Sequence, residues 1–252
     1  MINTTVKGKV KIVKLNRPTA NALDLCFLNQ LYGRLKEIEK DKQIQGVVLA
    51  SENVSVFSSG LDLKSLTSTP AHPKVNIIKA VWAVRRIVKL ITRSRKVYTA
   101  ALSGAVIGSA VSIVLACDFR FSSKSAWFWL PDPQYGGLLA DGGIDLIKSI
   151  CGTAGAKKCC LTSERIDSDC ASRMGLIHEI LKQDILEDHA CYYTSNIINH
   201  SKTTFKNTKR IINTNILKPF HWIKLLRVVH SKEMLQRLNT FKLLGGTYES
   251  AK

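Results

Sequence analysis

The segment QGVVLAS at residues 45–51 constrains the fold most strongly, because it is an apolar run without alternating polar positions. A run of this length and composition predicts a β-strand that is buried on both faces. Strands of that kind belong to sheets with both faces covered, as in α/β proteins. The segment VYTAALSG at residues 97–104 predicts a further strand.

The first half of the chain alternates strand and helix patterns, and mainly helical patterns follow. Residues 25–41, for example, place leucine or isoleucine at every third or fourth position, as an amphipathic helix does. This order predicts an α/β fold with a helical C-terminal region. Other strands are expected at residues 8–16, 118–123 and 175–181, and other helices at residues 74–92, 107–117 and from 184 onward.

The composition limits the kinds of partner that the chain is expected to bind. Its 252 residues carry a formal net charge of +18, from 37 Lys and Arg against 19 Asp and Glu. Because the basic residues are scattered, a nucleic-acid surface is not favoured. A phosphate-bearing substrate, an acidic carrier protein or a compositional bias towards lysine each account for the excess. No segment has the length of apolar sequence that a membrane span needs.

Cysteine spacing and the two ends of the sequence predict a cytoplasmic protein. The seven cysteines form no CxxC pair and no zinc-like spacing, so we expect reduced packing residues. The first residues lack the apolar core of a secretory signal, and the final YESAK carries no retention or peroxisomal tag.

Several common catalytic motifs are absent from the sequence. It contains no G-x-G-x-x-G, no P-loop, no H-E-x-x-H and no G-x-S-x-G. The six histidines are isolated from one another. The sequence therefore gives no indication of a metal site, a nicotinamide cofactor or nucleotide hydrolysis.

Two glycine-containing segments are the main candidates for a functional site. FSSGLDL (57–63) directly follows a predicted buried strand, and SGAVIGSA (103–110) opens a predicted helix. Small residues let a ligand approach the backbone, and the first N–H groups of a helix have no intrahelical acceptor. Two such N–H groups converging on one point could hold a carbonyl oxygen that becomes an enolate. The alternative for each segment is a tight turn or close helix packing.

The order of these segments resembles that of the crotonase (enoyl-CoA hydratase/isomerase) superfamily, and of its isomerases in particular. The chain has RPTANAL, then a helix, then GVVL, then FSSGLDL, in the order found in that family. AALSGAVIGSAVSIVLACDFRFSS is similar to the second family signature, and ADGG and ERIDSDCASRMGLIHEI continue the match. The resemblance covers roughly residues 8–200.

The resemblance implies a fold and an assembly. A crotonase-type ββα spiral is expected over residues 1–195, followed by a C-terminal helical trimerisation region at 196–252. Subunit contacts are expected through residues 203–243, giving a homotrimer or hexamer.

The resemblance also implies a thioester site. The two oxyanion-hole N–H groups fall on Ser59 and Ser109, where position 109 is usually glycine in the family. No cofactor is expected apart from coenzyme A as part of the substrate. The residues expected along the adenine and pantetheine of CoA are Ala20, Ala22, Ser59, Gly60, Leu61, Asp62, Leu63 and Gly108.

Three positions bear on the reaction. Hydratases of this family use two carboxylates, and the first of these positions is Ser112, which cannot act as a carboxylate. The second position holds Asp132, and Asp141 lies where some family isomerases carry their catalytic acid. We therefore expect Asp141 to be the proton shuttle and Asp132 to assist it. The alternatives are a helix N-cap for Asp141 and a turn residue for Asp132.

The expected activity is that of an enoyl-CoA isomerase, which shifts a 3-enoyl thioester to the conjugated 2-enoyl thioester through a dienolate. One alternative is a decarboxylase or dehydratase that acts on acyl groups bound to a carrier protein. A second alternative is a non-catalytic acyl-CoA-binding homologue, because Ser109 and Ser112 both depart from the commoner family pattern.

Overall fold

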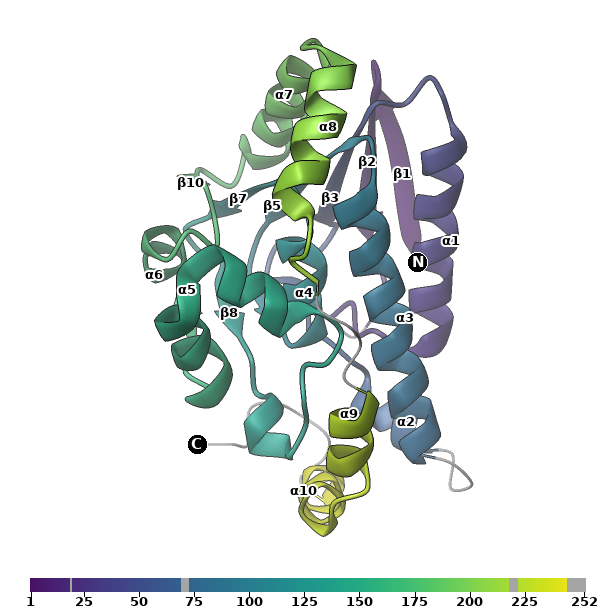
Figure 1. Ribbon diagram of the computed structural model, residues 1–252, viewed down its shortest axis with the longest axis vertical. Helices are drawn as coiled ribbons and strands as arrows, with labels where there is room; N and C mark the ends of the chain where they lie inside the picture. The colour runs from purple at the N-terminus through teal and green to yellow at the C-terminus, as the bar shows by residue number, and fades with distance from the viewer. Residues whose placement is uncertain (19, 69–72, 218–221, 244–252) are drawn as a thin grey trace.

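The main sheet of the protein has six strands in the order β1-β2-β3-β5-β7-β10. The computed structural model describes residues 1–18, 20–68, 73–217 and 222–243 (Figure 1). The first pair of strands is antiparallel and the other pairs are parallel. The strands are β1 (Ile2–Lys7), β2 (Val10–Leu15), β3 (Gly46–Ser51), β5 (Val97–Leu102), β7 (Phe119–Ser123) and β10 (Glu179–Leu181).

The predicted first strand is one half of a hairpin. Residues 8–16 contain β2, but the preceding residues also form a strand, β1, with Lys7 paired to Val10. Gly8 makes the tight connection with φ of +60°, a conformation that glycine adopts at little cost. Strand β1 lies at the sheet edge and is largely exposed, so it carries no buried apolar run that would have predicted it.

Helices cover both faces of the main sheet, as the apolar run in β3 predicted. Val48 and Ala50 pack against α7 on one face, in a cluster with Leu186 and Ala190. Val47 and Leu49 belong to the larger core on the opposite face, where α1 and α3 lie side by side (Figure 1). These helices are α1 (Leu25–Lys40), α3 (Pro73–Arg93) and α7 (Leu186–Ile198).

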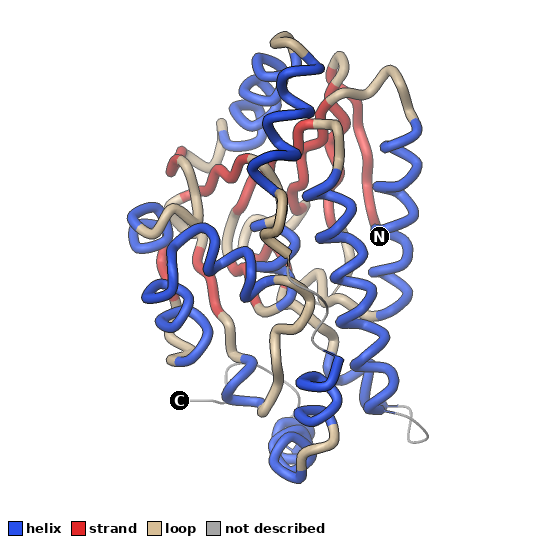
Figure 2. The backbone as a smooth tube through the Cα atoms, in the orientation of Figure 1, coloured by secondary structure: helices blue, strands red, loops and turns tan. Residues whose placement is uncertain are grey.

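A second sheet, in the order β4-β6-β8-β9, completes a spiral of repeated ββα units. Each turn adds one strand to the main sheet, one strand to the second sheet and then a helical segment (Figure 2). The turns run β3-β4-α2-α3, β5-β6-α4 and β7-β8-η1-α5, which confirms the predicted fold. The new elements are β4 (Val56–Ser58), β6 (Ala105–Ile107), β8 (Trp127–Trp129), β9 (Ile166–Asp167), α2 (Leu63–Ser68), α4 (Ser109–Leu115), the 3-10 helix η1 (Asp132–Tyr135), α5 (Gly143–Leu161) and α6 (Ser168–Arg173).

The C-terminal helices are part of the same core. The expected boundary between residues 195 and 196 falls inside α7. Leu225, Val229, Met234 and Leu238 are buried in the main apolar core. These side chains therefore stabilise their own subunit. The last helices are α8 (Lys202–Asn213), α9 (Trp222–Val229) and α10 (Lys232–Leu243).

Other side chains of this region face outward. Ile211 and Ile212 on α8 are 75% and 65% exposed, and Ile223 on α9 is 68% exposed. Such residues are available for subunit contacts, and the expected trimer stays a prediction. Among the described residues, no helix is both long and apolar enough to cross a bilayer.

Candidate active site

The two segments expected to hold CoA lie side by side. The N–H of Leu23 donates to the carbonyl of Gly60 (2.7 Å), and Leu23 forms a parallel bridge with Leu61. Ala20 and Asn21 both have positive φ, which turns the chain sharply beside β4. The buried amide of Asn21 stabilises this turn by donating to the carbonyl of Phe57 (2.9 Å).

Asp62 shapes this loop. One of its carboxylate oxygens lies 3.0 Å from the guanidinium of Arg17, and the other accepts the N–H of Ser65. Arg17 also contacts Asp24 (2.8 Å) and the carbonyl of Ala22 (2.6 Å). The side chain expected to line the CoA path is thus used to join two loops.

The two glycine-containing segments meet at Gly60. A Cβ atom on this residue would lie 2.6 Å from the carbonyl oxygen of Ile107 and 3.6 Å from the Cα of Gly108. Gly60 also has φ of +78°, so both the backbone conformation and the available space require glycine. The close approach places the 57–63 loop against the start of α4.

The two expected oxyanion-hole donors differ in their surroundings. The N–H of Ser59 already donates to the carbonyl of Ala20 (2.9 Å), and the N–H of Gly60 donates to the hydroxyl of Ser58 (3.2 Å). The N–H of Ser59, expected to be the first donor, is therefore engaged within the protein. Ser109 is the first residue of α4, where an N–H has no intrahelical acceptor.

Asp141 is completely buried beside α4. Its Oδ1 accepts the hydroxyl of Ser112 (2.7 Å) and the N–H of Gly143 (3.0 Å). Its Oδ2 is buried without a hydrogen-bond partner among the described residues. Burial raises the pKa of Asp141, while hydrogen bonding from Ser109 and Ser112 and the charge of Arg85 oppose that rise. The hydrogen bond that Asp141 accepts from the N–H of Gly143 lies at the start of α5. Asp141 therefore has part of the helix-capping role expected from the sequence.

Asp132 faces a neighbouring hollow, at the first position of η1. Burial, and secondly the negative charge of Asp141, raise its pKa to about 7. Its Oδ2 is also buried without a hydrogen-bond partner within the described part of the chain. The two expected acids are thus brought together, and the charge of Asp141 acts on the pKa of Asp132.

Asp132 lines a hollow of about 370 Å³ against α5. On another side it faces a narrow apolar pocket with about 70 Å³ of unfilled space. Asp141 does not line this narrow pocket, and its side chain is fully buried. The wall combines the glycine loops, the η1 segment and three helices. The lining residues are Leu61, Leu63, Ile77, Val81, Gly108, Ser109, Pro131, Asp132, Tyr135, Gly137, Leu138, Leu225, Val228, Val229, Met234 and Leu238.

The raised pKa of Asp132 gives a prediction about stability. Its pKa rises from 3.8 to about 7 on folding, so its stabilising contribution is lost as pH rises through this interval. Asparagine does not ionise, so Asp132→Asn removes this loss of stability. We expect a melting temperature higher by at least about 2 °C at pH 8, the shift that about 1 kcal/mol produces in a domain of this size. The gain should be clearly smaller at pH 5, and equal gains at both pH values would contradict the assignment.

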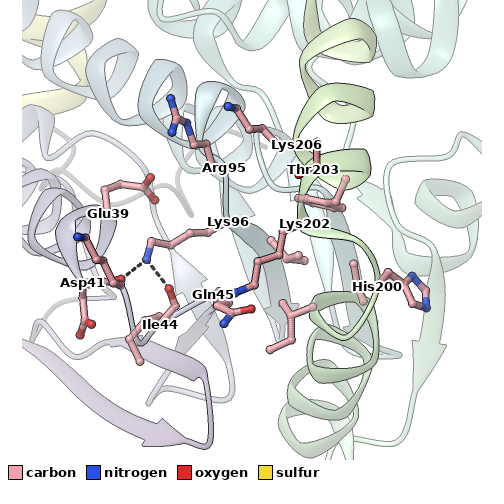
Figure 3. Close-up of a pocket in the computed structure, with 15 residues that line it drawn as sticks. Glu39, Asp41, Ile44, Gln45, Arg95, Lys96, His200, Lys202, Thr203 and Lys206 are labelled. Atoms are coloured by element: carbon pink, nitrogen blue, oxygen red, sulfur yellow. Dashed lines mark hydrogen bonds between the residues drawn. The ribbon is translucent and has the colours of Figure 1, made fainter.

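A separate hollow lies between the end of α1, the start of β5 and α8 (Figure 3). Figure 3 shows the Lys96 ammonium pointing at the carbonyls of Asp41 and Ile44, to which it donates. This hollow is lined by neither Asp132 nor Asp141, nor by any other residue predicted for the thioester site.

The sequence did not predict three features of the site. Ser112 was recognised only as a missing carboxylate, although it is the hydrogen-bond donor to Asp141. Arg85 acts electrostatically on Asp141 from α3, and no motif marks it. Met234 and Leu238 line the pocket, although their region was expected to serve subunit contacts. Only the periodic apolar residues of the last helix could have signalled a buried face.

A ββα spiral that brings two glycine loops and a pair of acids together is the architecture of the crotonase superfamily. The family model described as enoyl-CoA hydratase/isomerase matches residues 5–223, and the chain belongs to this family.

Relatives of the chain include both kinds of enzyme. It is 27% identical over 210 residues to the short-chain-enoyl-CoA hydratase of Clostridium acetobutylicum, covering 82% of this chain and 78% of that protein. It is 26% identical over 218 residues to the human mitochondrial Delta(3,5)-Delta(2,4)-dienoyl-CoA isomerase, covering 82% and 66%.

Solved structures agree on the fold. Human mitochondrial delta3-delta2-enoyl-CoA isomerase superposes with a TM-score of 0.87 at 19% identity, covering 97% of this chain and 98% of that one. An enoyl-CoA hydratase from Bacillus halodurans superposes with a TM-score of 0.86 at 21% identity, covering 95% and 99%.

Proposed function

We propose that this protein is an enoyl-CoA isomerase that converts a 3-enoyl thioester into the conjugated 2-enoyl thioester. One observation carries the proposal: of the described residues, Asp132 alone presents a carboxylate to the pocket, while Asp141 is buried and hydrogen-bonded to Ser112. Hydration needs one group to activate water and another to deliver a proton, whereas isomerisation needs one group to take a proton and return it.

Asp132 suits that task better than Asp141, which the sequence favoured. A general base works best when its pKa lies near the working pH, and the pKa of Asp132 is about 7. In the proposed reaction, its carboxylate removes the proton alpha to the thioester carbonyl. The resulting acid returns the proton at the gamma carbon. Asp141 acts through Asp132, because its negative charge raises the pKa of that group.

The dienolate between these two steps needs hydrogen-bond donors at the thioester oxygen. The N–H of Ser109 is one proposed donor, since Ser109 begins α4 and lines the pocket. We place the other donor at the Leu61 end of the 57–63 loop, because Leu61 lines the same pocket. The CoA moiety extends from there along Ala20, Ala22 and the loop.

The test compares isomerisation with hydration on one enzyme preparation. We expect 3-hexenoyl-CoA to be converted to the conjugated 2-enoyl product, followed by its ultraviolet absorbance. Hydration of crotonyl-CoA should be slower by at least about 100-fold, the contribution of one missing acid–base group. Efficient hydration with little isomerisation would overturn the proposal. A saturated acyl-CoA that binds while neither reaction occurs would favour a non-catalytic binding protein.

One observation also favours a second kind of substrate. The net charge of +18 suits an acidic carrier protein that presents the same acyl group. The same assay with the acyl group on carrier protein distinguishes the two, because a preference for the carrier should weaken as salt screens the charges.

A further inference from the structure

The end of the acyl pocket is closed by two helices of the same chain. On α9, Leu225 and Val229 are each 1% exposed, and on α10, Met234 and Leu238 are 4% and 6% exposed. All four line the same pocket as the glycine loops. In Figure 1, α9 and α10 lie together at one end of the molecule, close to α2 and α3.

Helices α9 and α10 are held to the rest of the site by specific contacts. The guanidinium of Arg237 donates to the carbonyl of Gln134 in η1 (2.8 Å). Gly136 lies directly against α10, because a Cβ atom there would be 3.1 Å from the Cα of Met234. Trp222 on α9 stacks on Trp82 of α3 with ring centroids 5.6 Å apart. The pocket end is therefore a packed wall.

The unfilled space in front of this wall is small. The pocket contains about 70 Å³. An engineered apolar cavity of about 150 Å³ holds one benzene molecule, so the space here suits roughly three carbon atoms. The wall residues from α9 and α10 are hydrocarbon or thioether, so a hydroxyl or charge at the end of the acyl chain would be buried without a partner.

We infer that this site selects short, unsubstituted acyl groups, and that Met234 and Leu238 set the upper limit of their length. The inference rests on the proposed function, for which it names the substrate class. A longer chain that enters the pocket against α9 and α10 has to displace side chains that are buried in the main core.

The test measures selectivity as a ratio within each protein. The kcat/KM for 3-decenoyl-CoA divided by that for 3-hexenoyl-CoA should be low in the wild type and should rise at least about tenfold in Leu238→Ala, since one methylene in an apolar pocket changes selectivity by that order. Met234→Ala should act in the same direction. The matched control is Leu235→Ala, which shortens an exposed leucine on the same helix and should leave the ratio unchanged.

Binding of saturated thioesters separates this inference from the proposed reaction. The wild type should bind butyryl-CoA more tightly than decanoyl-CoA in calorimetry, and Leu238→Ala should reverse or remove the preference. Absence of turnover with every chain length, together with this binding pattern, would overturn the reaction and leave the size limit standing. Wild-type binding or turnover of ten-carbon chains as good as that of short chains would overturn the size limit. An unchanged ratio in both Leu238→Ala and Met234→Ala would do the same.

Discussion

Asp132→Asn is expected to reduce kcat/KM for isomerisation by roughly 10²- to 10⁴-fold, the usual contribution of a positioned acid–base group. The substitution keeps the size of the side chain and removes its ability to take a proton. Binding of a saturated acyl-CoA should change little, because the proposed CoA contacts lie on other loops. In the wild type, activity should be retained above pH 7 and fall as pH drops through the raised pKa of Asp132.

Asp141→Asn is the matched variant for this prediction. It removes the charge that raises the pKa of Asp132, so the acid limb of the pH–rate profile should move to lower pH while much of the activity at pH 8 remains. A purely structural role for Asp141 would lower activity without moving the profile. An inactive Asp141→Asn beside an active Asp132→Asn would restore the assignment that the sequence favoured.

Ser109→Pro is expected to cost on the order of 100- to 1,000-fold in kcat, the effect of losing one oxyanion-hole donor. Proline lacks the N–H, yet it is tolerated at the first position of a helix, which is where Ser109 lies in α4. The variant should therefore fold, as circular dichroism and thermal unfolding would verify.

Ser109→Ala distinguishes the contribution of the backbone N–H from that of the side-chain hydroxyl. Alanine keeps the N–H and removes the hydroxyl that opposes the rise in the pKa of Asp141. We expect turnover at pH 8 within about tenfold of the wild type, well short of the loss from a missing donor. A folded Ser109→Pro enzyme with near-normal turnover would show that the donor lies elsewhere.

Much of the fold could be predicted because it depends on local sequence. The apolar run of β3 predicted a strand covered on both faces, and α1 and α7 provide that cover. The family motifs predicted the ββα spiral. The hairpin partner β1 was missed, since an exposed edge strand needs only one good neighbour and leaves no buried pattern in the sequence.

The residue types of the site were also determined by the sequence. Gly60 permits the close approach to Ile107, Ser112 replaces a carboxylate, and Asp132 and Asp141 supply the acids. These properties belong to individual side chains, so a sequence can reveal them without coordinates. The absence of a carboxylate at position 112 was enough to direct attention to isomerisation.

Only the tertiary structure decided which of these groups face the pocket and which are engaged elsewhere. Whether Asp132 or Asp141 faces the pocket depends on which is covered by neighbours, and the hydroxyl of Ser112 and the N–H of Gly143 hold Asp141 inside. Whether the N–H of Ser59 is available depends on the distant carbonyl of Ala20. Burial and hydrogen bonding are set by residues far apart in the chain, and they control the pKa of an acid and the availability of a donor.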